Sequence, residues 1–376
     1  MNLETVAYVR ETPEPEDPPP TLTSDALAWA RANLFSSPVS SLTTVGLLAL
    51  AAYLLPQLAV WATTGAVWSA TDGAACRQHQ DGACWAFVIA KWDYLRFGSY
   101  PVAERWRVDA VEAVGAVLIV WLLRTSAPRR ALGAFLFFVI YPVFALVLLR
   151  GAALLGLPFV DTLLWGGIFV SLITAVVGIV FSLPLGVLLA LGRRSSLPVV
   201  RLASVVFIEF VRGVPFITIL FMANNLLPLF LPERWAPDRF LRPLVGIVIF
   251  SAAYMAEEVR GGLQSLGRGQ YEAALALGLN YPRVMGLVIL PQALTLVIPG
   301  IVNNFIGLFM DTTLISVVGM TDFLEAMNNA IKDPLWAGPT IMVTGYVFAA
   351  IFYFSFCFGM ARYSAHIERI LVKGRK

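Results

Sequence analysis

Long runs of apolar residues without charge follow one another along the chain. The hydrocarbon core of a bilayer is about 30 Å thick, so a helix needs roughly 20 apolar residues to cross it. The segment at 108–123 begins with Asp109 and Glu112, and we include it because residues 114–123 are wholly apolar. The runs do not alternate between apolar and polar positions, so a membrane β-barrel is not expected. The pattern predicts eight membrane-spanning helices, at 41–62, 108–123, 131–150, 161–191, 202–226, 241–259, 291–312 and 339–361.

Composition agrees with this pattern, because 58% of the 376 residues are hydrophobic and only 14% are charged. Soluble domains average roughly 45–50% apolar and about 25% charged residues. The net charge of +3 comes from scattered basic residues, so a nucleic-acid partner is not expected. Three cysteines and two histidines leave little material for a metal site. We therefore predict an all-α polytopic membrane protein without a metal centre.

The distribution of lysine and arginine predicts the orientation, because cytoplasmic loops collect these residues. More of them fall inside if residues 1–40 and the basic tail 366–376 are cytoplasmic. Both termini are then inside. Residues 11–20 are acidic and rich in proline, which predicts a disordered leader. They lack the basic and apolar regions of a signal peptide.

The predicted external loop 63–108 carries Cys76, Cys84 and several tryptophans. An oxidising compartment could join the two cysteines in a disulfide, and two unpaired thiols are the equal alternative. The tryptophans favour a place at the lipid interface over ligand binding. Cys357 lies in the last predicted span and is interpreted as a small core residue.

The segment 267–294, GRGQYEAALALGLNYPRVMGLVILPQAL, differs from the other loops. Glu272 is expected in the first turn of a short helix, where a carboxylate suits the helix dipole. Gly278 suits a left-handed residue after that helix, and Pro282 suits the first turn of the next one. Pro291 marks the start of the seventh span. Composition alone leaves open an interfacial helical hairpin that binds nothing.

The segment contains Glu-Ala-Ala, then Gly after three residues, then an aliphatic residue after nine more, and Leu-Pro one residue later. This spacing resembles the cytoplasmic signature loop of ABC-importer permeases. The only departure is Val288 at the aliphatic position, where isoleucine is usual. The segments 207–221, 251–279 and 290–319 are similar to the polar amino acid permease family, and the resemblance covers about 160–370. The matching residues of the loop are Glu272, Ala273, Ala274, Gly278, Leu290 and Pro291.

The resemblance implies a type I ABC-importer core of five helices, preceded here by three extra helices. This enlargement resembles the larger permease subunit of the bacterial general L-amino acid transporter and of its glutamate/glutamine/aspartate/asparagine relative. The expected segments are a leader at 1–40, an extension at 41–160, a core at 161–365 with a coupling loop at 263–290, and a tail at 366–376.

The resemblance also implies partners. The coupling loop would dock on a cytoplasmic ATPase, present in two copies, which would bind ATP and Mg because this chain lacks a phosphate-binding loop. A paralogous permease would complete a heterodimer in the lipid of the bacterial inner membrane. A periplasmic amino-acid-binding protein would deliver the amino acid substrate. The chain itself is then a transport permease and not an enzyme.

Polar residues at membrane depth are costly, roughly 2.5–3.5 kcal/mol for an ionisable group at a helix centre. Glu209 and Arg212 lie three apart and could pair with each other as a structural ion pair or contact substrate. Gly213 and Pro215 should bend or break that helix. Glu257 and Glu258, next to Arg260, are expected to hold the coupling loop.

In the seventh span, Asn304 and Asp311 lie seven apart on one face, with Gly307 between them. Thr312 and Thr313 continue this polar strip, which could line a substrate pathway or form hydrogen bonds between helices.

An ion-coupled secondary amino acid transporter is the alternative function. That class usually shows internal repeats and charges clustered at the midplane, and neither is evident here. An intramembrane enzyme is a poorer alternative, because His79 and His366 both fall outside the predicted spans.

Overall fold

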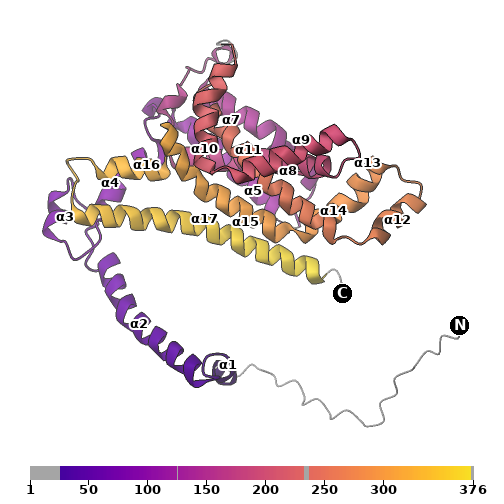
Figure 1. The fold of residues 1–376 in the computed structure, drawn as a ribbon. Coiled ribbons are helices and arrows are strands. Elements are labelled where there is room, and N and C mark those ends of the chain that lie inside the picture. Colours follow the sequence, from indigo (N-terminus) through magenta and orange to yellow (C-terminus); the bar gives the residue numbers. More distant parts are fainter. Residues whose placement is uncertain (1–25, 125, 233–236, 374–376) are drawn as a thin grey trace, which may run out of the picture. The chain divides into compact units, whose positions relative to one another are not determined.

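The computed structural model describes residues 26–124, 126–232 and 237–373 (Figure 1). The predicted leader at 11–20 and residues 374–376 of the predicted tail lie outside this description. The chain divides into two compact units, Met1–Ala66 and Val67–Lys376.

The first unit contains α1 (Ala26–Asn33) and the long apolar helix α2 (Pro38–Ala62). The Ser37 side chain caps α2 by accepting a hydrogen bond from the amide of Ser40, and Pro38 occupies the first helical position. With 25 residues, α2 is about 37 Å long, enough to cross a bilayer.

The described residues of the second unit are mainly helical, and they include one pair of two-residue strands. Short π- or 3-10-helical segments continue several helices, among them η2 (Leu136–Ile140), η5 (Met222–Leu226), η6 (Leu227–Phe230), η8 (Val284–Ile289) and η9 (Thr312–Val318). The helices are α3 (Ala74–Gln78), α4 (Trp85–Phe97), α5 (Arg105–Leu123), α6 (Arg130–Phe135), α7 (Tyr141–Arg150), α8 (Ile168–Arg193), α9 (Pro198–Gly213), α10 (Phe216–Phe221), α11 (Leu241–Ser265), α12 (Arg268–Ala276), α13 (Tyr281–Arg283), α14 (Leu290–Leu296), α15 (Ile298–Asp311), α16 (Phe323–Ile331) and α17 (Pro339–Lys373).

The all-α membrane architecture is confirmed, whereas the count of eight spans is not. Within the described residues, five helices are long and apolar enough to cross a bilayer: Pro38–Ala62, Arg130–Arg150, Ile168–Arg193, Ile298–Val318 and Pro339–Leu371. A sixth span results if the bent pair Pro198–Gly213 and Phe216–Phe230 counts as one. Helices α5 and α11 occupy the other two predicted spans, but charged residues in their sequences make them more polar than a typical span.

The predicted span at 202–226 is not a straight helix. Helix α9 ends at Gly213, α10 starts after Pro215, and the two parts are bent by 110°. The proline causes this break, since its ring excludes a backbone donor and clashes with the preceding turn. The predicted effect of Gly213 and Pro215 is therefore confirmed.

Helix α8 packs along α11, the most extensive helix pair of the second unit. Buried small residues recur every fourth position of α8, at Gly178, Ser182, Gly186 and Ala190. A methyl group on Gly186 would lie only 3.0 Å from the carbonyl oxygen of Ala252 on α11. Small side chains therefore let the two backbones approach closely, as in many membrane helix pairs.

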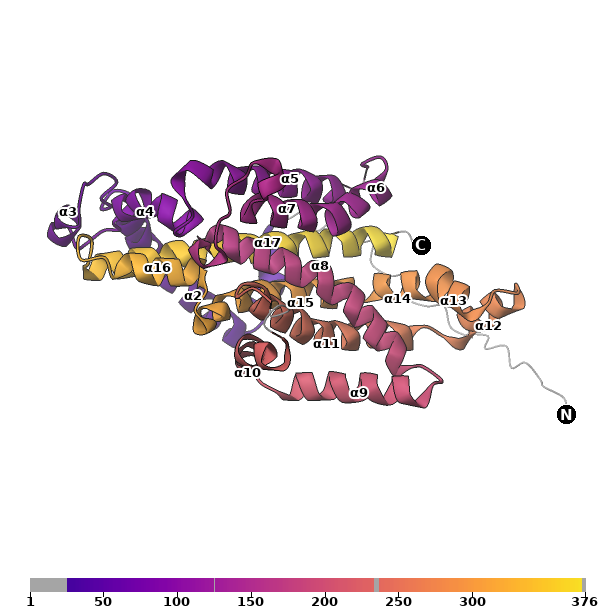
Figure 2. The ribbon, with the colours of Figure 1, turned by 90° about the horizontal axis from the view of Figure 1, so that it is seen from above.

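Two ends of the second unit are distinct in both views (Figures 1 and 2). Helices α3, α4 and α16 lie at one end, and α12 and α13 lie at the other. At the first end, β1 (Gly166–Gly167) pairs in parallel with β2 (Thr321–Asp322), which joins the start of α8 to the start of α16. Asp322 caps α16 by accepting hydrogen bonds from the amides of Leu324 and Glu325.

Residues 67–104, which we name the cap, fold at this same end. The cap contains α3, α4 and the single turn η1 (Val102–Glu104). Of the two alternatives that the sequence leaves open for Cys76 and Cys84, the structure has the disulfide.

Candidate functional site

The predicted order of helix, turn and helix is present at the end of the unit opposite the cap. Helix α12 ends at Ala276, and Gly278 follows with a left-handed φ of +73°. The amides of Gly278 and Leu279 donate to the carbonyls of Leu275 and Ala274, which closes the helix end. Pro282 then lies in the first turn of α13.

One expectation about α12 is wrong. Because Gly267 is the N-cap and the helix begins at Arg268, Glu272 falls in the second turn, and the first turn holds no acidic residue. Glu272 thus lies farther from the helix N-terminus than a favourable charge–dipole interaction requires.

The two predicted alanines of α12 point in different directions. Ala273 is exposed beside Glu272, whereas Ala274 is 3% exposed and packs in a core cluster with Val284 and Ile289. The two alanines are therefore divided between the surface and the core. Of the other predicted residues here, Leu290 is half-buried, while Gly278 and Pro291 are exposed.

Sequence reasoning missed three exposed apolar side chains in and just after α12. Leu275, Leu277 and Tyr281 are 58%, 81% and 60% exposed. Together with Glu272 and Ala273 they form an exposed surface, which we name the α12 face. Apolar groups gathered next to a charge are typical of a protein-binding surface. The leucines of the sequence ALALGL carried this signal, but their exposure was not predictable.

Hydrogen bonds tie α12 to the long helices. Arg194, at the end of α8, donates from Nη1 to the Tyr271 hydroxyl over 3.0 Å and to the Leu263 carbonyl over 3.2 Å. Its guanidinium also lies 5.6 Å from the centre of the Tyr271 ring. Gln292 of α14 donates to the Gln270 side chain over 3.3 Å.

An ion network joins α8, α9 and α11 near this end. Arg193 Nη1 lies 2.8 Å from a carboxylate oxygen of Glu209 and 2.8 Å from one of Glu257. Arg260 contacts the other oxygen of Glu257 at 2.7 Å, and Arg212 approaches it at 3.6 Å. Glu257 is thus the centre of the network.

The predicted pairing of Glu209 with Arg212 is wrong for the described residues. Glu209 pairs with Arg193 of α8, and Arg212 turns toward Glu257 of α11 and the ring of Tyr254. The bend after Gly213 and the packing of α9 on α8 and α11 bring these other partners within reach.

The polar strip of the seventh span lies on α15 and η9. Asn304 donates to the carbonyl of Gly300 over 3.2 Å, Thr312 to that of Phe309 and Thr313 to that of Met310. Thr312 is fully buried, whereas Asn304, Asp311 and Thr313 are half-buried.

Asp311 makes no side-chain hydrogen bond or ion pair with any described residue, and its carboxylate is therefore available to a cationic group. A methyl group on Gly307, one turn earlier, would meet no atom within 4 Å, so the helix surface there borders open space. Among the described residues, no group of three or more histidine, cysteine, aspartate or glutamate side chains could hold a metal ion.

The family profile described as "Binding-protein-dependent transport system inner membrane component" matches residues 182–371. The inner membrane amino-acid ABC transporter permease protein YhdY of Escherichia coli (strain K12) is 46% identical, over 94% of this chain and 95% of its own. The glutamate/glutamine/aspartate/asparagine transport system permease protein BztC of Rhodobacter capsulatus is 38% identical, over 98% and 99%. A crystal structure of an amino acid ABC transporter with histidines aligns with a TM-score of 0.47 and 27% identity, over 54% of this chain and 91% of that one.

Proposed function

Because this chain belongs to the binding-protein-dependent transport system inner membrane components and is a permease subunit of an amino-acid ABC transporter, we propose that it forms one transmembrane half of an importer for polar L-amino acids. An ATPase docked on the α12 face drives the transport cycle. Similarity along nearly the whole chain to amino-acid permeases supports this assignment, and an ion-coupled secondary transporter has no support among these relatives.

The observation that carries the proposal is the division of α12 between an exposed and a buried side. The α12 face offers apolar groups and the Glu272 carboxylate to a partner, whereas Ala274 fixes the helix to its own chain. A partner that binds this face can therefore move the helix as a body. Such a helix suits coupling better than a loop without internal packing would.

The anchoring contacts give the route by which movement reaches the membrane. Arg194 connects α12 directly to the end of α8, and the Gln270–Gln292 hydrogen bond connects it to α14. The ion network around Glu257 holds the neighbouring ends of α8, α9 and α11 together. A displacement of α12 is thus passed to several helices at once.

Energy comes from outside this chain. The sequence contains no glycine-rich loop followed by lysine and serine or threonine of the kind that cradles phosphates. ATP and Mg therefore bind to the two ATPase subunits, and this chain contributes the docking helix and part of the pathway. A paralogous permease completes the membrane dimer, and a periplasmic binding protein supplies the amino acid.

Asp311 is the residue that we assign to the substrate pathway. Its carboxylate lacks a partner among the described residues and can accept the ammonium group of an amino acid, with the Asn304 amide about two turns away on the same helix. The open space beside Gly307 leaves room near both side chains. The α12 face then lies on the cytoplasmic side of the bacterial inner membrane, with both termini cytoplasmic and the cap outside.

The test is a purification of the full chain, tagged at the C-terminus, in mild detergent from its native membrane. We expect an ATPase and a second permease to co-purify, and the ATPase to be lost from Glu272→Lys. Asp81→Lys is the matched control, because it reverses an exposed carboxylate of the cap, at the opposite end of the unit. Recovery of the ATPase by Glu272→Lys at the level of the control would overturn docking on α12. Uptake of glutamine or glutamate into ATP-free vesicles would overturn the importer.

A further inference from the structure

The cap has no role in the function proposed so far. It lies before the part of the chain that the family profile matches, and at the end of the unit opposite α12. Its contacts are nevertheless specific, and they converge on two places in the core: the turn between α16 and α17, and the start of α8.

A buried disulfide closes the cap. Cys76 and Cys84 lie eight positions apart in the sequence, and they are 1% and 0% exposed. They belong to one apolar cluster with Phe87 of the cap and with Phe323 and Trp336 of the core. The disulfide therefore lies inside the interface between the cap and the core.

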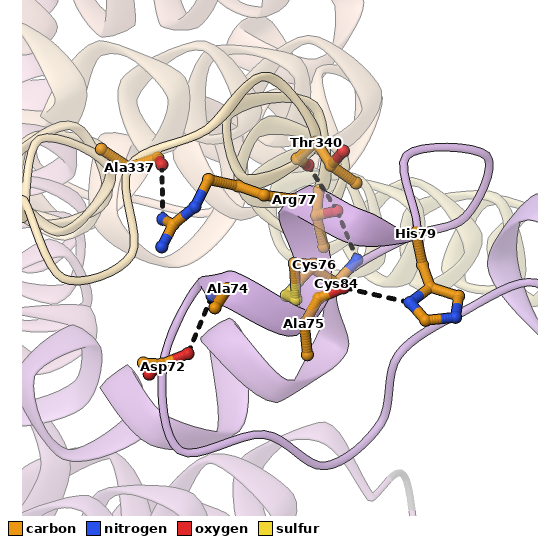
Figure 3. Close-up of a disulfide and its surroundings, with 10 residues drawn as sticks. Asp72, Ala74, Ala75, Cys76, Arg77, His79, Cys84, Ala337 and Thr340 are labelled. Carbon is orange, nitrogen blue, oxygen red and sulfur yellow. Dashed lines mark hydrogen bonds between the residues drawn. A yellow bond between two sulfur atoms is a disulfide. The ribbon is translucent and has the colours of Figure 1, made fainter.

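Polar contacts join the cap to the turn between α16 and α17 (Figure 3). Arg77 donates to the carbonyl of Ala337 over 3.1 Å. The amide of Gly73 donates to the carbonyl of Leu335 over 3.0 Å. Lys91 of α4 forms an ion pair with Asp333 in the same turn. These bonds cover the turn of seven residues, 332–338, that connects α16 to α17.

Further contacts reach the first turns of α17. The amide of Cys84 donates to the buried hydroxyl of Thr344 over 2.9 Å. The ring of Phe87 lies 5.9 Å from that of Trp336, and the ring of Trp92 lies 6.3 Å from that of Phe348. The cap thus packs against both the turn 332–338 and helix α17, which follows it.

The other end of α4 holds the start of α8. Gly98 forms a bridge with Trp165, immediately before β1. Gly167 has a φ of +77°, and a methyl group there would lie only 2.8 Å from the carbonyl carbon of Leu95. Such close backbone approach leaves no room for α8 to slide against α4.

We propose that the cap is a positioning element that fixes the cap-side ends of α8 and α17 relative to each other. Because α4 contacts both helices, a change in their spacing at this end would break the Lys91–Asp333 pair and the packing around the disulfide. Movement of these two helices during transport is therefore confined to the α12 end. This inference rests on the proposed transport function, whose own test is the recovery of the ATPase.

Swapping the charges of the Lys91–Asp333 ion pair tests whether the cap holds the turn 332–338 in place. Lys91→Glu, Asp333→Lys and the double variant are purified as full chains with their co-purifying subunits, and amide hydrogen exchange is followed at 332–348. We expect exchange there to rise about tenfold in each single variant and to return toward wild type in the double variant, with no change at 268–276. Amide exchange at 332–348 that stays at the wild-type rate in the single variants, or that does not return toward it in the double variant, would show that this ion pair does not hold the turn.

Uptake tests the functional part of the proposal. Cys76→Ser combined with Cys84→Ser loosens the cap, and Cys357→Ser, which removes the free cysteine of α17, is the control. We expect glutamine uptake per ATP hydrolysed to fall about tenfold or more in the double variant while the ATPase still co-purifies and exchange at 268–276 stays as in wild type. If amide exchange at 332–348 is raised but Lys91→Glu, Asp333→Lys and the double cysteine variant all take up glutamine at the wild-type level, the positioning role is overturned. Loss of the ATPase from the wild type would instead overturn the proposed function and leave the exchange result intact.

Discussion

The hydroxyl of Tyr271 on α12 accepts a hydrogen bond from the guanidinium of Arg194, at the last turn of α8. Tyr271 directly precedes Glu272, the charged residue of the α12 face, so the contact ties the proposed docking surface to a membrane-spanning helix. The same guanidinium reaches the end of α11 through the carbonyl of Leu263. One side chain thus connects three helices.

Arg194→Ala should weaken coupling without preventing assembly. A hydrogen bond to a charged group contributes about 1.5–3 kcal/mol, so we expect a fall of about tenfold or more in amino acid uptake per ATP hydrolysed. Tyr271→Phe should reproduce part of the loss, because it keeps the ring and removes the hydroxyl. Proteoliposomes containing the whole complex give both rates. Equal ratios in wild type and both variants would contradict the connection.

Gly186→Ala should destabilise the packing of α8 on α11. The new methyl group would lie 3.0 Å from the Ala252 carbonyl oxygen and 3.1 Å from the Ala256 amide, and a rigid backbone cannot yield to it. We expect a loss of about 1–3 kcal/mol, seen as a lower thermal unfolding midpoint. Gly359→Ala in α17 is the control, since it has open space and should gain up to about 1 kcal/mol of helix propensity.

The cap should become less stable at acidic pH because Asp333 is then protonated. The hydrogen bond from Lys91 holds the pKa of Asp333 below its ordinary value of 3.8. The folded state therefore favours the ionised form. The stabilisation of the folded state by ionised Asp333 is complete above pH 3.8. It is lost as the pH falls through the lower pKa that Asp333 has in the folded state. The thermal midpoint of Asp333→Asn should lie below that of wild type at neutral pH and converge with it in acid. A difference that persists unchanged at low pH would contradict the assignment.

Asp311→Asn with Asn304→Ala should lower amino acid uptake and leave ATPase recovery unchanged. The double variant removes the carboxylate and the amide that we assign to the pathway, and both lie far along the chain from the α12 face. We expect a fall of about tenfold or more, because an ammonium group would lose a charged partner. The control is Ser355→Ala in α17, which removes an exposed hydroxyl outside the polar strip. Uptake at the wild-type level in the double variant would remove Asp311 from the pathway.

Much of the architecture was predictable because long uninterrupted apolar runs in the sequence indicate membrane-spanning helices. The break at Gly213 and Pro215 and the turn at Gly278 were also predictable, because local backbone chemistry decides them. The spans at α5 and α11 were less clear, since each carries charges along part of its length. Length and composition alone therefore could not establish how many helices cross the bilayer.

The partners of charged side chains were not predictable from spacing. Glu209 and Arg212 have the separation of an ion pair on one helix face, yet each has a better partner on another helix. Ala273 and Ala274 are neighbours with the same chemistry, and only the packing of α12 separates the exposed one from the buried one. The cap reads as a loop in the sequence because the residues that complete its core, such as Trp336, lie more than 200 positions away.

That separation has a consequence for how the protein is made. Cys84 and its partner Thr344 are 260 residues apart. A ribosome adding about 5–20 residues per second needs roughly 13 to 52 seconds to pass from one to the other. For most of this interval the side of the cap that packs on Phe323 and Trp336 is uncovered, and both thiols are open to enzymes that oxidise or bind nascent chains. The Cys76–Cys84 bond thus has time to form on an unfinished protein, and packing of α17 against the cap completes its burial.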